Sequence, residues 1–222
     1  DTILMRPPHP QFELIKEHYR HFIHLRGHRN EPCFYEIPAK TNLKALREAG
    51  VSVDDLLMHY VSVIEFLWQV VEPSDLSRSI YVLDLDGIRL GDFVGDVMDF
   101  VKRASKLCSL HYPERAGTVF VINVPRWFNI IWRVVKPLVD EVTLEKIRIF
   151  RGNRMQTAQL LQEKIPIEHL PPEYGGLSVP LGQSPEERKF LAWLKHNHSG
   201  RCPRTPENLS REYCSWVPVR SY

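Results

Sequence analysis

The chain has 222 residues, of which 43% are hydrophobic and 25% are charged, a composition that excludes wholesale disorder. A chain of this length fits one large domain and buries enough apolar surface to fold without a disulfide or metal staple. Twenty-nine basic residues against 27 acidic ones leave a net charge of only +2, which excludes a polybasic nucleic-acid-binding protein.

Cysteine use and hydropathy indicate a cytoplasmic protein. The four cysteines, at positions 33, 108, 202 and 214, form no CxxC pair, which is typical of reduced thiols. The apolar runs are too short and too interrupted to span a bilayer, and no signal-peptide pattern is visible. We therefore expect a cytoplasmic location and a monomer.

The first part of the chain is predicted to be mainly helical. Apolar residues at helical spacing predict a helix over 11–24, and a turn at 26–30 leads to a short strand over 33–37. Asn42 is a suitable cap for a small helix that ends near Gly50. Ser52 and Asp55 form a capping box before an apolar stripe that reaches Pro73, which predicts a long core helix.

Strand and helix patterns alternate over residues 80–150. Continuous apolar stretches at 80–85, 118–124 and 146–150 predict buried strands. The segments 93–108 and 127–139 between them have helical periodicity. Strands spaced by about 30 residues with helices between them indicate a βαβαβ unit with a parallel sheet, so the predicted fold class is α/β.

The last part of the chain has weaker patterns. We expect a helix over 157–164, a PPEYGG turn at 171–176 and a helix over 185–196. Residues 201–222 carry three prolines and little periodicity. The predicted organisation is one domain over residues 1–200, followed by a C-terminal tail or linker over 201–222.

The sharpest enzyme-like motif is LDLDG at 83–87. An apolar strand that ends in Asp-x-Asp-Gly is how haloacid-dehalogenase-like phosphotransferases present two aspartates to Mg²⁺. The motif lies in mid-chain, however, and Ile88 replaces the usual Thr. Two aspartates, Asp84 and Asp86, that close a strand and open a turn are an adequate structural explanation, and we favour it.

Other signatures of catalysis or metal binding are missing from the sequence. It contains no GxxxxGK[ST], GxSxG, HExxH or GxGxxG motif. The spacing of His196, His198, Cys202 and Cys214 fits no zinc template, so these are interpreted as solvated tail residues. We expect no metal site.

The helix predicted from Trp127 has more apolar surface than a helix on one side of a sheet needs. Its polar positions form one basic stripe, because Arg126, Asn129, Arg133 and Lys136 fall three, four and three residues apart. Such a helix suits a membrane surface or a lid over an apolar ligand. The alternative is a helix buried on both sides by the C-terminal segment, and the helix alone does not decide between these readings.

Several ordered motifs resemble those of the CRAL-TRIO family, and more closely the yeast-type phosphatidylinositol/phosphatidylcholine transfer proteins. The resemblance extends from about residue 12 to residue 180. It is carried by HYPERAG at 111–117, FVINVPRWF at 120–128, the run from Trp132 through VVKPLVDEVTLEKI to Ile147, and HLPPEYGG at 169–176.

The resemblance implies an α/β lipid-binding domain of the CRAL-TRIO fold. A mostly parallel sheet would form the floor of an apolar pocket, and a mobile gate helix at 127–139 would cover it and contact the membrane. The residues that the resemblance assigns to the gate and its membrane contact are Trp127, Phe128, Ile131, Trp132, Arg133, Val135 and Lys136.

The resemblance also implies head-group residues. Glu114, Thr143 and Lys146 match the inositol-phosphate subsite in type, with Lys146 at the start of the strand 146–150 and facing the pocket wall. The phosphatidylcholine subsite resembles Ser79 and Tyr81 with Phe34 and Tyr35, although Tyr81 stands where the family has Thr and Phe34 where it has Tyr. An alternative for Glu114 is an internal ion pair with Arg115.

These expectations together describe a soluble phospholipid-binding and transfer protein that is not an enzyme. Phosphatidylinositol is the favoured ligand and phosphatidylcholine the second. No cofactor, no nucleic acid and only transient peripheral membrane contact are expected. One alternative is a lipid-sensing regulatory module without net transfer, and the remaining alternative is the Mg²⁺-dependent phosphotransferase.

Overall fold

A five-stranded sheet, in the order β1-β2-β3-β4-β5, forms the centre of the fold. The computed structural model describes Leu4, residues 10–112 and residues 114–198. β1 pairs with β2 in antiparallel orientation, and the three other pairs are parallel. The predicted α/β class with a mostly parallel sheet is therefore confirmed. The strands are β1 (His21–Arg26), β2 (Pro32–Glu36), β3 (Ser79–Asp84), β4 (Ala116–Ile122) and β5 (Ile147–Ile149).

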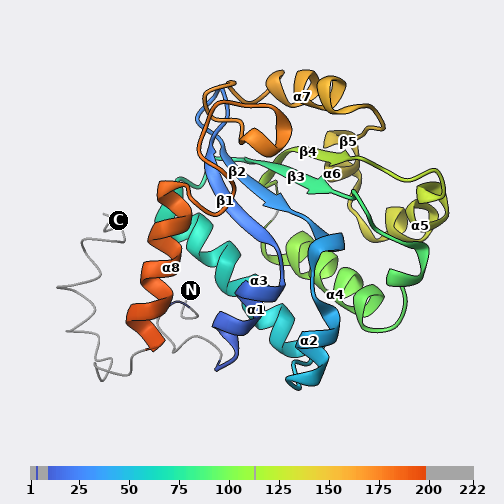
Figure 1. Cartoon of the computed structure of the whole chain (residues 1–222), viewed down its shortest axis with the longest axis vertical. Helices are drawn as coiled ribbons and strands as arrows, with labels where there is room; N and C mark the ends of the chain where they lie inside the picture. The colour runs from blue at the N-terminus through green and yellow to red at the C-terminus, as the bar shows by residue number, and fades with distance from the viewer. Residues whose placement is uncertain (1–3, 5–9, 113, 199–222) are drawn as a thin grey trace.

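Helices cover both faces of this sheet, and Figure 1 shows α3 and α4 on one side of it and α7 on the other. Short 3₁₀ turns, and one π turn at η3, join or extend these helices. The helices are α1 (Phe12–His18), α2 (Leu43–Glu48), α3 (Val53–Phe66), α4 (Asp96–His111), α5 (Phe128–Val135), α6 (Glu141–Lys146), α7 (Arg154–Gln162) and α8 (Pro185–His198). The short turns are η2 (Pro38–Lys40), η3 (Leu67–Val71), η4 (Leu90–Asp92), η5 (Lys136–Leu138) and η6 (Pro172–Tyr174).

Alternation along the strands divides the side chains between two layers. Tyr35, Val82 and Phe120 pack on the α7 side, in a cluster with Leu161 of α7. The neighbouring residues in each strand point to the α3 and α4 side, because successive side chains of a strand alternate between faces. This second face is the one that carries the cavity described below.

The N-terminal segment differs from the prediction. Instead of a helix over 11–24, α1 ends at His18 and β1 begins at His21. The pattern was misleading because β1 is buried on both faces, so that Phe22 and Ile23 are both apolar although they point to opposite sides. Pairing with β2 outweighs the local helical spacing.

The segment after β4 is also shorter in helix than predicted. α5 ends at Val135, and Pro137 lies in the 3₁₀ turn η5, because a proline inside an α-helix removes one hydrogen bond and clashes with the preceding turn. A further short helix, α6, follows and ends at Lys146. The prediction that Lys146 begins the last strand is therefore wrong, because β5 begins one residue later at Ile147.

The predicted helix starts are confirmed where a cap defines them. The Ser52 side chain accepts a hydrogen bond from the backbone N–H of Asp55, and the Asp55 carboxylate accepts one from the backbone N–H of Ser52, which completes the capping box of α3. The Asn42 side chain caps α2 by accepting a hydrogen bond from the backbone N–H of Ala45. The helix expected at 93–108 begins later, at Asp96, after Gly95 with a φ of 57°.

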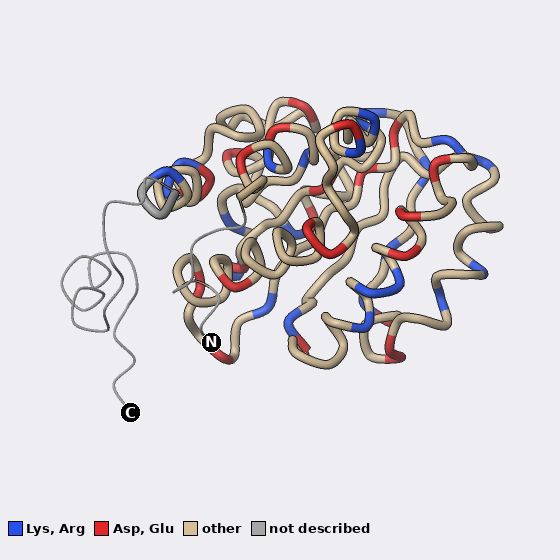
Figure 2. Tube along the Cα trace, turned by 90° about the horizontal axis from the view of Figure 1, so that it is seen from below, with Lys and Arg blue, Asp and Glu red and all other residues tan. Residues whose placement is uncertain are grey.

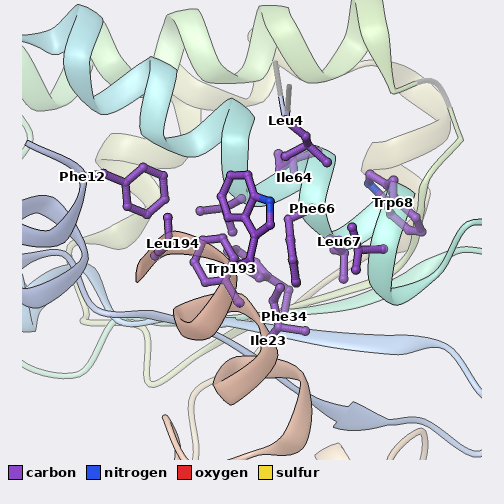
Figure 3. Close-up of a cluster of buried hydrophobic side chains, with 13 residues drawn as sticks. Leu4, Phe12, Ile23, Phe34, Ile64, Phe66, Leu67, Trp68, Trp193 and Leu194 are labelled. Atoms are coloured by element: carbon purple, nitrogen blue, oxygen red, sulfur yellow. The ribbon is translucent and has the colours of Figure 1, made fainter. Parts of the chain in front are cut away.

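The C-terminal helix α8 packs into the main core. Trp193 and Leu194 lie against Phe66 of α3 and Phe12 of α1 in this cluster (Figure 3). The buried Glu187 of α8 also forms an ion pair of 2.5 Å with Lys16 of α1, in a region where removing one partner leaves a buried charge. α8 is thus part of the domain, whereas the tail predicted over 201–222 lies outside the described residues.

Candidate functional site

An apolar cavity of about 880 Å³ lies between the sheet and the helices α3 and α4. This volume is at the upper end of the range of about 300–1,000 Å³ found for ligand pockets. The sheet contributes Leu83, Val119 and Val121, all from the face opposite α7. The helical wall comes mainly from apolar residues of α3 and α4, namely Leu56, Ile64, Val97, Phe100, Val101 and Ala104.

One wall of the cavity is the inner face of α5. Four of the predicted gate residues line the cavity from this helix, and they are Phe128, Ile131, Trp132 and Val135. The rings of Phe128 and Trp132 stack with their centres 6.1 Å apart. Trp127 is not among the lining residues and instead packs edge-on against Phe93 at 6.2 Å.

The outer face of α5 is unusual because it combines exposed apolar and basic side chains. Ile130 is 53% exposed and Val134 is 47% exposed. Arg133 and Lys136 are exposed beside them. No acidic residue occurs between Val124 and Val139, whereas acidic and basic residues are interspersed over much of the described trace (Figure 2). Among the described residues the outer face of α5 is thus exposed, whereas residues 199–222 of the C-terminal segment, which the buried-helix alternative invoked, lie outside the described residues.

The predicted inositol-phosphate residues lie before the first residues of β4 and β5. Glu114 precedes β4 and Thr143 belongs to α6, and both line the cavity. Glu114 forms an ion pair of 2.9 Å with Arg78, and the side chains of both residues are exposed. The expected alternative, a pair between Glu114 and Arg115, does not form, since Arg115 instead pairs with Asp75 at 3.3 Å.

Lys146 is the third predicted residue of this group. Its Nζ is buried and makes no hydrogen bond within the part of the chain that the structure describes. Lys146 is not a lining residue of the cavity. Burial acts to raise the pKa of the nearby Asp140, but hydrogen bonds from Thr143 and the positive charge of Lys146 outweigh it and leave that pKa below its ordinary value.

The predicted phosphatidylcholine residues are divided between the two faces of the sheet. Phe34, Ser79 and Tyr81 line the cavity. Ser79 donates a hydrogen bond of 3.3 Å to the backbone carbonyl of Arg115. Tyr35 lies on the opposite face, where its ring stacks on Tyr174 at 5.6 Å, so the structure does not bring it to the cavity.

A buried polar group in the cavity wall was missed by the sequence analysis. Glu36 is 8% exposed, and its Oε1 accepts a hydrogen bond of 2.6 Å from the hydroxyl of Tyr19. The hydroxyl of Tyr81 donates to its Oε2. Burial raises the pKa of Glu36, although these two hydrogen bonds act to lower it. The available signal was a charged residue two positions after Phe34 in an otherwise apolar strand.

The motif LDLDG is explained by the hydrogen bonds of its first aspartate. Asp84 Oδ1 accepts bonds from the side chain of Asn123 at 2.7 Å and from the backbone N–H of Asp86 at 3.0 Å. Its Oδ2 accepts a bond of 3.0 Å from the hydroxyl of Tyr174. These three donors tie β3 to β4 and to the PPEYGG turn, and Asp84 lies on the face away from the cavity.

Two negative findings apply only to residues 4, 10–112 and 114–198. In that part of the chain, no group of three or more His, Cys, Asp or Glu side chains is arranged to hold a metal ion. No helix there is long and apolar enough to cross a membrane. The zinc-like set named above is not covered by this finding, because Cys202 and Cys214 lie outside the described residues and the side chains of His196 and His198 are not described.

Comparison with known proteins places this architecture in one family. Residues 16–176 match the CRAL/TRIO domain. The chain is 29% identical over 184 residues to the SEC14 cytosolic factor of Candida glabrata, a match covering 80% of this chain and 60% of that protein. It is 27% identical over 183 residues to phosphatidylinositol/phosphatidylcholine transfer protein SFH4 of Arabidopsis thaliana, covering 79% of this chain and 29% of that protein.

A solved structure shares the fold. The crystal structure of Sfh5 superposes with a TM-score of 0.55 at 18% sequence identity, over 67% of this chain and 52% of that one. The residues matched to the CRAL/TRIO domain, 16–176, contain all five strands and the residues that line the cavity. This chain belongs to the CRAL/TRIO domain family.

Proposed function

We propose that the protein is a phospholipid carrier that takes up and releases its ligand at membrane surfaces. The observation that carries this proposal is the apolar cavity of about 880 Å³ with α5 as one of its walls. Each acyl methylene that leaves water gains about 0.8 kcal/mol, so an apolar cavity that receives the acyl chains lowers the cost of moving a lipid between bilayers. The names of two relatives, a phosphatidylinositol/phosphatidylcholine transfer protein and a cytosolic factor, support it.

Phosphatidylinositol is the ligand that we favour. Lys146 does not itself line the cavity, but it lies between the lining residue Thr143 and β5, and its buried Nζ has no hydrogen-bond partner among the described residues. A buried ammonium group that makes no hydrogen bond is costly, and a phosphodiester oxygen that reached it would supply a charge-assisted hydrogen bond. Glu114 and Thr143, which line the cavity at the same edge of the sheet, would accept and donate hydrogen bonds to ring hydroxyls of inositol.

Phosphatidylcholine is the second ligand in this proposal. The hydroxyl of Tyr81, which stands where the family has Thr, is already engaged with Glu36. Only the Ser79 hydroxyl, which itself bonds to a backbone carbonyl, would remain for the phosphate of phosphatidylcholine. The aromatic faces of Phe34 and Tyr81 would still attract a choline group.

The outer face of α5 is the proposed membrane contact. Exposed Ile130 and Val134 suit the boundary between head groups and acyl chains, and Arg133 and Lys136 beside them would be attracted to anionic lipid. This contact would be peripheral and transient, and we propose a cytoplasmic location for it.

The test measures two quantities for wild type and Lys146→Ala: the binding of labelled phosphatidylinositol and phosphatidylcholine, and the transfer of each lipid between vesicles. We expect Lys146→Ala to reduce phosphatidylinositol binding by about tenfold or more, because a charge-assisted hydrogen bond is lost, with a smaller effect on phosphatidylcholine. Lys44→Ala, which removes an exposed lysine of α2, is the control. Equal loss for both lipids would give Lys146 a structural role, and binding without transfer would identify a lipid-sensing module.

A further inference from the structure

Glu36 is a buried carboxylate in the wall of an apolar cavity. Within the part of the chain that the structure describes, no lysine, arginine or histidine forms an ion pair with it. Two neutral phenols, from Tyr19 and Tyr81, are its hydrogen-bond donors. Each carboxylate oxygen can accept more than one hydrogen bond, so the group retains acceptor capacity toward the cavity.

Aromatic rings pack around the two tyrosines that donate to this carboxylate. Besides the two tyrosines that donate to it, Phe34, Tyr60 and Phe100 also line the cavity. The ring centres of Phe34 and Tyr81 are 5.7 Å apart, and Phe100 packs edge-on against both Tyr19 and Tyr60, at 6.1 Å and 5.9 Å. The negative faces of aromatic rings attract a cation, and more strongly where water is excluded.

The Glu36 site lies far from the proposed phosphate site along the sheet. Glu36 is level with Leu83 in the pairing of β2 and β3. Ser79, four residues before Leu83, is level with Ala116, and Glu114 precedes that residue. At about 3.3 Å per residue, the two polar sites are separated by about 13 Å along the strands. Glu36 is therefore distinct from the phosphate-binding residues, although its site shares Phe34 and Tyr81 with the proposed choline contact.

We propose that the cavity also binds long-chain amines, with the ammonium group paired to Glu36 and the alkyl chain along the apolar walls. Burial raises the pKa of Glu36, and an ammonium group beside it favours the ionised carboxylate. Glu36 is already removed from water in the folded protein, so the ligand adds mainly the desolvation cost of its own ammonium group. In return the ammonium group gains a counter-charge, hydrogen bonds from as many as three N–H donors, and contact with aromatic faces.

The same geometry disfavours anionic amphiphiles at this end of the cavity. A carboxylate or phosphate beside Glu36 would place two negative charges together in an apolar environment, where their repulsion is weakly screened. A neutral alcohol of the same chain length would gain the apolar contacts and one ordinary hydrogen bond. The expected order of affinity is therefore amine, then alcohol, then carboxylate. This inference concerns a second ligand class and does not depend on phosphatidylinositol binding at Lys146.

The experiment measures the binding of dodecylamine, dodecanol and dodecanoate to the delipidated 222-residue chain at neutral pH, below their aggregation concentrations. Displacement of a fluorescent fatty alcohol from the cavity is the readout. We expect wild type to bind dodecylamine at least about tenfold more tightly than dodecanol, as for a charge-assisted hydrogen bond in a buried site. Equal affinities, or tighter binding of dodecanoate, would overturn the proposal without any variant.

Two variants locate the effect. Glu36→Gln should abolish the preference for the amine and leave dodecanol affinity within about twofold. Glu65→Gln is the matched control, because Glu65 accepts a hydrogen bond from Tyr112 but does not line the cavity, and it should keep the preference. A preference that persists in a folded Glu36→Gln protein would refute the assignment.

A parallel assay keeps this result separate from the proposed carrier function. Phosphatidylinositol transfer is measured with wild type alone. Loss of the amine preference with transfer intact would reject the Glu36 site and keep the carrier. An amine preference in a protein that transfers no phosphatidylinositol would reject the carrier and keep the Glu36 site.

Discussion

Reversing the charge of the outer face of α5 tests whether this helix contacts membranes. The variant Arg133→Glu/Lys136→Glu changes two exposed residues that do not line the cavity. Their neighbours Ile130 and Val134 stay in place, so the apolar part of the contact is unchanged. The change therefore acts on the electrostatic part of membrane binding alone.

The size of the effect follows from the number of charges. Each basic side chain near an anionic bilayer contributes about 1 kcal/mol, so wild type gains about 2 kcal/mol from Arg133 and Lys136. Reversal removes this attraction and adds a repulsion of similar size, about 4 kcal/mol in total. Since about 1.4 kcal/mol corresponds to a factor of ten, the affinity for anionic vesicles should fall by two to three orders of magnitude at low salt.

The assay is vesicle flotation together with lipid transfer, with and without anionic lipid in the vesicles. Binding to anionic vesicles should weaken with salt in wild type, because the charge attraction is screened over about 8 Å at physiological ionic strength. The control Arg188→Glu/Lys195→Glu makes the same change on exposed residues of α8, at the opposite edge of the molecule from α5 (Figure 1). Wild-type transfer rates in the α5 variant, or an equal loss in the α8 variant, would refute the reasoning.

Three further predictions concern individual side chains. Asp84→Asn should lower stability by about 1–3 kcal/mol, because its three donors need acceptors, while lipid binding stays intact; a Mg²⁺-dependent phosphatase activity that this variant loses would contradict the structural role. Trp132→Ala should slow lipid transfer, because it removes an aromatic ring from the cavity wall, and a wild-type rate would argue against α5 as the gate. Burial lowers the pKa of His24 in the folded protein to about 4. As pH falls below 6.5, His24 therefore binds a proton in the unfolded chain before it does so in the folded protein, which destabilises the fold. The stability lost between pH 7 and pH 5, measured by urea unfolding, should then be smaller by about 2 kcal/mol in His24→Gln than in wild type, and equal losses would contradict this.

The parts of the fold that could be predicted are those in which local pattern and tertiary environment agree. α3 has a capping box and one apolar stripe, and β3 and β4 are short apolar runs buried between two helical layers. β1 could not be predicted in this way, because its residues also fit a helical repeat. The turn predicted at 26–30 favours a hairpin between β1 and β2, but the helical spacing of Phe22 and Ile23 favours a helix, and the sequence does not show which of the two signals prevails.

The candidate site was predictable from motifs but not from residue chemistry alone. The four lining residues of α5 lie where an amphipathic pattern puts them, on one side of the helix. The Tyr35 prediction failed for a simple reason, since adjacent strand residues point to opposite faces and only Phe34 can face the cavity. Glu36 was missed because a single charge in a strand has no periodic signature, and its two phenol donors are 17 and 45 residues away along the chain.

Native mass spectrometry of the protein purified from cells tests the central claim most directly, since that claim is an internal cavity filled by a phospholipid. Wild type should carry one phospholipid per chain, enriched in phosphatidylinositol. Ala104→Trp, which places a large side chain in the cavity from α4, should lose the lipid, whereas Ala192→Trp on the exposed side of α8 should keep it. A folded wild-type protein without phospholipid, or a folded Ala104→Trp protein that retains full occupancy, would contradict the account.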